Sequence, residues 1–154
     1  GSIEARKGLE KTFFKYLKLG FSILVIGNVS NSYKMRFSNF AKIKFLGPKK
    51  YIQIHKYYKI CKYGLNYIPD EFPYNAQYST KFLEYSASKL NIISNKTVFM
   101  KEISKKYKIK NIYDEDIHTA QDLKNAQFQH INMLNYQWNV VLQKSGILKK
   151  LCVE

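Results

Sequence analysis

Apolar and polar residues alternate along much of the chain after residue 20. Residues 21–26 form a continuous apolar run, which predicts a buried strand. Residues 33–37 and 41–45 each alternate apolar side chains with Lys or Arg, so a strand over either segment places its bases on one face. Gly47-Pro48 turns the chain, and residues 52–55 alternate again. We therefore predict an antiparallel, hairpin-rich sheet with one apolar and one basic face.

Near the C-terminus the apolar residues repeat with a helical period instead. The repeat consists of Ile117, Ala120, Leu123, Phe128, Ile131, Leu134, Trp138 and Leu142. Their spacing predicts one long amphipathic helix with a single buried stripe, in which Trp138 is a core residue. Residues 114–116 are all acidic and stand at the predicted start, where carboxylates cap a helix and interact favourably with its dipole. Ser145-Gly146 is expected to end it.

Other segments leave two interpretations open. Residues 3–14 fit a short helix, but the continuation to Leu19 fits a strand equally well, and residues 97–113 fit strand or helix. Residues 79–90 are compatible with a helix. A chain of 154 residues with 45% hydrophobic residues is long enough for one core, so we predict a single α+β domain over 1–154. Its expected parts are an N-terminal extension or short helix (1–14), a sheet-rich core with a helical insertion (15–113), and a C-terminal helix and tail (114–154).

Charge is distributed very unevenly. Twelve Lys and Arg residues and no Asp or Glu lie between Lys11 and Pro69, whereas nine of the eleven acidic residues follow Pro69. Codon bias explains why 24 Lys accompany only 2 Arg, and a solvated basic face is a sufficient structural reason for many of them. Codon bias explains the absence of Asp and Glu from residues 11–69 less well. A positive electrostatic field beside many aromatic residues favours a polyanionic partner.

Several classes of function receive no support. Cys61 and Cys152 are too few for a disulfide framework, and no spacing joins them with the three His as metal ligands, so we expect no metal, no cofactor and a reducing compartment. Tyr85-Ser-Ala-Ser-Lys89 fits the Tyr-x-x-x-Lys signature of short-chain dehydrogenases, but a Gly-rich dinucleotide turn is missing. No apolar run approaches the length of a spanning helix. We expect a non-enzymatic, cytoplasmic protein.

The sharpest candidate site combines Lys18 with Lys34-Met35-Arg36, which begins sixteen positions later. If these bases lie on paired strands of a first hairpin, they converge on one phosphate group. Among twelve bases such a pattern also arises easily by chance. The complete set of candidate ligand-binding residues is Lys15, Lys18, Lys34, Arg36, Lys42 and Lys44.

Three patches of the sequence resemble a pleckstrin-homology domain: Lys15–Gly20, Lys34–Phe37 and Trp138–Lys144. Such domains open with a Gly/Leu/Lys strand, carry Lys and Lys/Arg-x-Arg across the first hairpin, and close with a helix whose Trp is followed by Leu one turn later. The resemblance implies a bent sheet or barrel capped by that helix, with an anionic phospholipid headgroup at the open end. Lys18, Lys34 and Arg36 would be its ligands. Acylated pleckstrin-homology proteins that sense phosphatidic acid are one candidate group.

We therefore expect a module that binds phosphatidic acid or a phosphoinositide, placing the protein peripherally on an anionic membrane surface. The alternative is an RNA-binding or single-stranded nucleic-acid-binding protein, in which the bases of residues 34–44 track phosphates and aromatic residues stack on bases. The alternation weakens it, because it directs the aromatics away from the basic face. A third possibility is a basic structural subunit of a larger assembly that contacts RNA or an acidic protein. The sequence does not specify an oligomeric state.

Overall fold

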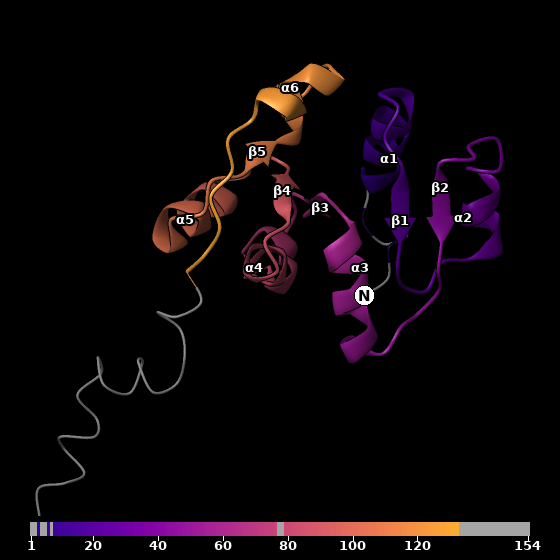
Figure 1. Cartoon of the computed structure of the whole chain (residues 1–154), viewed down its shortest axis with the longest axis horizontal. Coiled ribbons are helices and arrows are strands. Elements are labelled where there is room, and N and C mark those ends of the chain that lie inside the picture. Colours follow the sequence, from indigo (N-terminus) through magenta and orange to yellow (C-terminus); the bar gives the residue numbers. More distant parts are fainter. Residues whose placement is uncertain (1–2, 4–5, 7, 77–78, 133–154) are drawn as a thin grey trace, which may run out of the picture.

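The computed structural model describes residues 3, 6, 8–76 and 79–132 (Figure 1). The strands are β1 (Ile23–Val25), β2 (Ile43–Phe45), β3 (Tyr63–Asn66), β4 (Asn91–Ser94) and β5 (Ile112–Tyr113). The α-helices are α1 (Leu9–Lys18), α2 (Asn31–Met35), α3 (Tyr51–Ile60), α4 (Thr80–Ala87), α5 (Val98–Tyr107) and α6 (Ala120–Asn125). Two 3-10 turns, η1 (Tyr74–Ala76) and η2 (Asp114–Asp116), complete the described elements.

The strands form two small sheets, β1-β2 and β3-β4-β5, and every pair within them is parallel. The predicted antiparallel, hairpin-rich sheet, and with it the bent sheet that the resemblance implied, is therefore wrong. Parallel neighbours need a crossover connection, and helices α2, α4 and α5 supply it between successive strands. Among the described residues the antiparallel contact is a single bridge between Lys110 and Gln129.

The predicted strand at residues 33–37 is wrong, because most of this segment belongs to a short helix in which buried and exposed side chains also alternate. The side chain of Ser30 accepts a hydrogen bond from the Tyr33 amide and starts α2 there. Tyr33 and Phe37 lie four residues apart and are both buried, whereas Met35 is 73% exposed. Spacing of four places two side chains on the same face of a helix, so the buried pair fits a helix as well as a strand.

The predicted strand at residues 52–55 is likewise wrong, because that segment lies inside helix α3. Three other predictions agree with the structure. The apolar run at 21–26 contains β1, and the segment 41–45 contains β2. The segment 79–90 contains helix α4.

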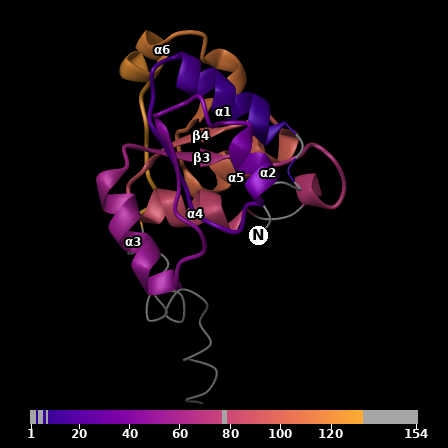
Figure 2. The ribbon, with the colours of Figure 1, turned by 90° about the vertical axis from the view of Figure 1, so that its right-hand side faces the viewer.

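Helices cover both faces of the strands. In β4, Ile92 belongs to the hydrophobic cluster under α4 and α5, and the next residue, Ile93, belongs to the cluster on the α1 side. In β3 the Cα of Gly64 approaches the ring of Tyr85 on α4, whereas Leu65 packs on the opposite side. Figure 2 shows this arrangement, with α1 and α6 above β3 and β4 and with α3 and α4 below them.

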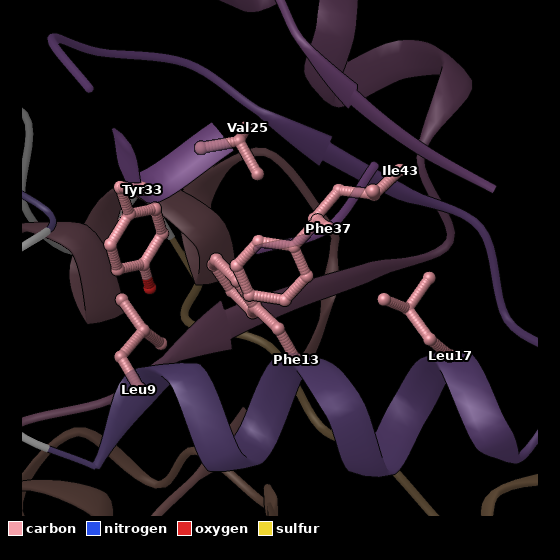
Figure 3. Close-up of a cluster of buried hydrophobic side chains, with 7 residues drawn as sticks. All are labelled: Leu9, Phe13, Leu17, Val25, Tyr33, Phe37 and Ile43. Carbon is pink, nitrogen blue, oxygen red and sulfur yellow. The ribbon is translucent and has the colours of Figure 1, made fainter. Parts of the chain in front are cut away.

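Helix α1 packs where the two sheets meet. Its residues Leu9, Phe13 and Leu17, one turn apart, are buried against β1, β2 and the Phe37 region (Figure 3). Tyr16, on a neighbouring face of the same helix, is buried with Ile93 and with residues after β5. Figure 1 shows the strands in the order β2, β1, β3, β4, β5. Side-chain packing joins the sheets, since among the described strands β1 and β3 share no ladder.

The predicted long C-terminal helix is wrong over residues 114–132. The acidic residues 114–116 form a 3-10 turn, and a separate helix, α6, begins after Thr119, whose hydroxyl accepts from the Asp122 amide. Residues 126–132 then run without a helix. The predicted positions Leu134, Trp138, Leu142 and Ser145-Gly146 lie outside the described residues.

Phe37 tests the packing of α1 on the first sheet, because its ring contacts those of Phe13, Phe14, Tyr33 and Phe45. We expect Phe37→Ala to lower the free energy of unfolding by about 3–5 kcal/mol, the usual range for a buried Phe. Met35→Ala, at the end of α2 two residues earlier, should change it by no more than about 0.5 kcal/mol, because Met35 is exposed. Urea unfolding of both variants measures this, and equal effects would contradict the packing.

Candidate anion-binding site

The outer face of α1 carries three lysines. Lys11, Lys15 and Lys18 follow one another at spacings of four and three, which places them on one side of the helix. Lys11 and Lys18 are exposed, and Lys15 is half-buried. The helix turns this side outward because its other sides bury Leu, Phe and Tyr residues against the two sheets. The position of the lysines therefore follows from the packing of the core.

These lysines border an open depression whose floor is apolar and largely aromatic. Its lining consists of Lys11, Phe14, Lys15, Lys18, Leu19 and Phe40. Phe14 stacks on Phe37 with ring centroids 4.6 Å apart, and its ring lies 5.6 Å from that of Phe40. The buried Phe37 thus fixes the floor, and the lysine side chains rise beside it.

Lys15 differs from its two neighbours because it is already paired. Its ammonium group donates to the backbone carbonyl of Asp114 and lies 3.1 Å from the carboxylate oxygen Oδ1 of the same residue. Lys11 and Lys18 form no side-chain hydrogen bond or ion pair with another described residue. Two of the three lysines are therefore available to an anionic ligand, while the third is positioned by the protein.

Asp114 also accepts a hydrogen bond from the hydroxyl of Tyr16, with 2.6 Å between the two oxygens. Burial raises the pKa of Tyr16 far above its ordinary value, and the hydrogen bond to Asp114 raises it further. Tyr16 therefore stays protonated, and keeps donating to the carboxylate, over the whole physiological pH range. This contact and the Lys15 pair tie α1 to the end of β5.

The structure does not bring Lys34 and Arg36 into this depression. Both lie at α2 or its end, and residues two apart on a helix point in different directions. Lys34 approaches the side-chain oxygen of Asn31 at 3.5 Å, and Arg36 forms a 2.8 Å ion pair with Glu10 on α1. The expected convergence of Lys34 and Arg36 with Lys18 across a first hairpin is wrong, since α1 and α2 replace that hairpin.

Lys42 and Lys44 also have separate positions. The ammonium group of Lys42 donates to the carbonyl of Gly20 at 3.0 Å, which brings it to the end of α1. Lys44 is exposed in β2, and its neighbours Ile43 and Phe45 pack toward α1. Because side chains alternate along a strand, Lys44 points away from the α1 side.

Of the six predicted residues, the structure thus groups Lys15 and Lys18 in one lining. Lys11, Phe14 and Phe40 complete that lining and were missed by the sequence prediction. The signal for Lys11 was present, because three lysines at spacings of four and three are typical of a helix face. It was missed because the sequence left the segment up to Leu19 open between helix and strand, and the pleckstrin-homology resemblance implied a strand at Lys15–Gly20. The contribution of Phe40 depends on tertiary packing and has no local signal.

No family model matches this chain, and no curated protein and no solved structure matches it at a significant level. The resemblance to pleckstrin-homology domains is therefore neither supported nor refuted by comparison. Within the described ranges, no helix is both long and apolar enough to cross a membrane. In the same part of the chain, no three His, Cys, Asp or Glu side chains are grouped in a way that would hold a metal ion.

The raised pKa of Tyr16 predicts a loss of stability at high pH. Above about pH 10 the unfolded chain ionises its tyrosines, whereas the folded chain keeps Tyr16 protonated, so the free energy of unfolding falls as the pH rises. Tyr16→Phe removes this contribution, and we expect a shallower fall between about pH 10 and 11. At pH 7 the variant should be less stable by about 1 kcal/mol, because it lacks the hydrogen bond to Asp114.

Urea unfolding at a series of pH values measures both effects. Tyr51→Phe is the matched control, because Tyr51 is 61% exposed; its unfolding free energy should follow the wild-type pH dependence. If Tyr16→Phe and wild type showed parallel curves above pH 10, the buried Tyr16–Asp114 contact would be disproved.

Proposed function

We propose that the chain is a non-enzymatic binding module for an anionic phospholipid headgroup, phosphatidic acid or a phosphoinositide, and that the ligand binds at the depression on α1. The observation that carries this proposal is the placement of three lysines on one helix face beside an aromatic floor. A phosphomonoester attached to a lipid presents negative charge next to apolar groups, which is the pairing that this lining complements.

The unpaired lysines supply most of the expected attraction. A Lys near an anionic bilayer surface contributes about 1 kcal/mol, and Lys11 and Lys18 are exposed and uncompensated. Lys15 is partly neutralised by Asp114 and so contributes mainly by fixing the geometry. Phe14 and Phe40 offer apolar surface to the glycerol and upper acyl region of a lipid.

The surroundings of the depression favour a membrane over an isolated anion. Glu10, the acidic residue of α1, is engaged by Arg36, and Asp114 is engaged by Lys15 and Tyr16. Met35, at the end of α2, is exposed between Lys34 and Arg36, and an apolar side chain flanked by bases suits the membrane interface. The proposal places the protein peripherally on the cytoplasmic side of an anionic membrane.

Nucleic acid remains the alternative that shares the phosphate chemistry. Single-stranded binders stack bases on open aromatic rings. One face of Phe14 is already covered by Phe37, and Phe14 and Phe40 are only partly exposed. The aromatic floor is therefore less suited to stacking than to contact with a lipid.

Liposome co-sedimentation at physiological salt tests the site. Vesicles containing phosphatidic acid or a phosphoinositide are compared with phosphatidylserine vesicles of matched charge. We expect wild type to prefer the phosphomonoester lipids, and Lys11→Ala/Lys18→Ala to bind them roughly 30-fold more weakly, because about 2 kcal/mol of attraction is removed. The preference over phosphatidylserine should disappear in this variant.

Lys101→Ala/Lys105→Ala on α5 is the charge-matched control, since both lysines are exposed and removal also costs two positive charges. An equal loss in the control would mean that net charge alone drives binding, and the α1 site would be rejected. Fluorescence anisotropy with single-stranded RNA is run in parallel. RNA binding that depends on Lys11 and Lys18, without vesicle binding, would favour the nucleic-acid alternative.

A further inference from the structure

Helix α3 is the least buried long helix of the described chain. It has ten residues and none is buried, whereas α1, α4 and α5 each bury at least two side chains. Its Tyr51, Ile52 and Ile60 are 61%, 76% and 72% exposed. An isolated helix of this length is marginal in water, so a contact on one side has to hold it.

That contact is with α4. The ring of Tyr58 meets the ring of Tyr85 at 5.5 Å, and the Tyr58 hydroxyl donates to the carboxylate of Glu84 at 3.0 Å. These contacts fix which side of α3 turns inward. Ile52 and Ile60 are spaced two turns apart, and their exposure shows that they lie on the outward side.

Lysines flank the two exposed isoleucines along the chain, and Lys56 lies one helical turn from each of them. The α3 surface, as we define it, consists of Ile52, Ile60, Lys49, Lys50, Lys56, Lys59 and Lys62. The closest acidic side chain on the neighbouring helix, Glu84, is already engaged by Tyr58 and Lys81. The surface therefore combines uncompensated positive charge with protruding apolar side chains.

This combination indicates what covers the surface. A second copy packed α3 against α3 would bring two sets of lysines together, and like charges at an interface are unfavourable. An anionic bilayer accepts both features at once, because Ile side chains enter the interface while Lys ammonium groups stay among the headgroups. Charge complementarity thus favours an anionic lipid surface over a second copy.

The α3 surface and the α1 depression lie on opposite faces of the strands. Gly64 of β3 contacts Tyr85 on α4, the helix that holds α3, and the next residue, Leu65, packs in the cluster under α1. Neighbouring side chains of a strand point to opposite faces. Figure 2 agrees, since α1 lies above β3 and β4 while α3 lies below them. A single flat bilayer cannot contact both surfaces.

We propose that the α3 surface is a second membrane-binding surface, and that one chain bound through both faces holds two anionic bilayers together. The inference rests on the proposed lipid binding at α1 and adds a distinct activity, the clustering of vesicles. Insertion of Ile52 and Ile60 anchors the second bilayer, and the surrounding lysines select an anionic one.

Dynamic light scattering of vesicles that contain phosphatidic acid tests the proposal. Wild type should increase the mean particle size, and Ile52→Gln/Ile60→Gln should abolish the increase while the protein still co-sediments with the vesicles. This variant keeps the net charge of +15, so its effect cannot come from lost charge. Val98→Gln is the matched control, because Val98 is 75% exposed outside the α3 surface; it should cluster vesicles like wild type.

Two results would overturn the bridging role. One is co-sedimentation of wild type without any increase in particle size, and the other is clustering that the isoleucine variant leaves unchanged. Light scattering during size exclusion, without lipid, adds a third: a wild-type dimer that the variant dissociates would assign the surface to a second copy. If wild type does not co-sediment at all, the lipid proposal for α1 fails as well, so the two failures are distinguishable.

Discussion

Burial of α1 at the junction of the two sheets is the packing on which the rest of the described structure depends. Leu9, Phe13 and Leu17 bind the helix to β1 and β2, and Tyr16 binds it to the side of β4 and β5. Once these sides are inside, the lysine-bearing side has to face solvent. The chemistry of the candidate site is thus a consequence of core formation, and the loss of one buried ring at this junction would disturb both.

Charge is divided unevenly between the part of the chain before Pro69 and the part after it. The first half has no carboxylate after Glu10 until Asp70, and the acids around β5 are occupied: Asp114 by Lys15 and Tyr16, and Glu115 by the Lys96 amide. Few carboxylates of the described residues are therefore left to neutralise the lysines of α1 and α3. This asymmetry explains why an external polyanion is a better partner for these surfaces than another part of the described chain.

The sequence allowed the α+β class, β1 and β2, and two lysines of the candidate site to be predicted. The prediction failed where the strand period of two residues and the helical period of about 3.6 residues bury the same side chains. Tyr33 and Phe37 are four apart, so both a strand and a helix place them on one side, and only the Ser30 cap decides. Ile117 and Leu123 fit one helical stripe, yet they are buried from separate elements because a 3-10 turn and a loop also return side chains to the core. Phe40 joins the lining through packing that no local pattern encodes.

The junction between β1 and β3 is held by side chains and by α1, without the backbone hydrogen bonds that join the other neighbouring strands. Hydrogen-bonded strands separate together, whereas a packed junction opens as soon as its apolar contacts are lost. Local opening of the chain would therefore begin at this junction before the strands of either sheet separated. If α1 left this junction, the two sheets would lose their contact with each other while each sheet kept its hydrogen-bonded register.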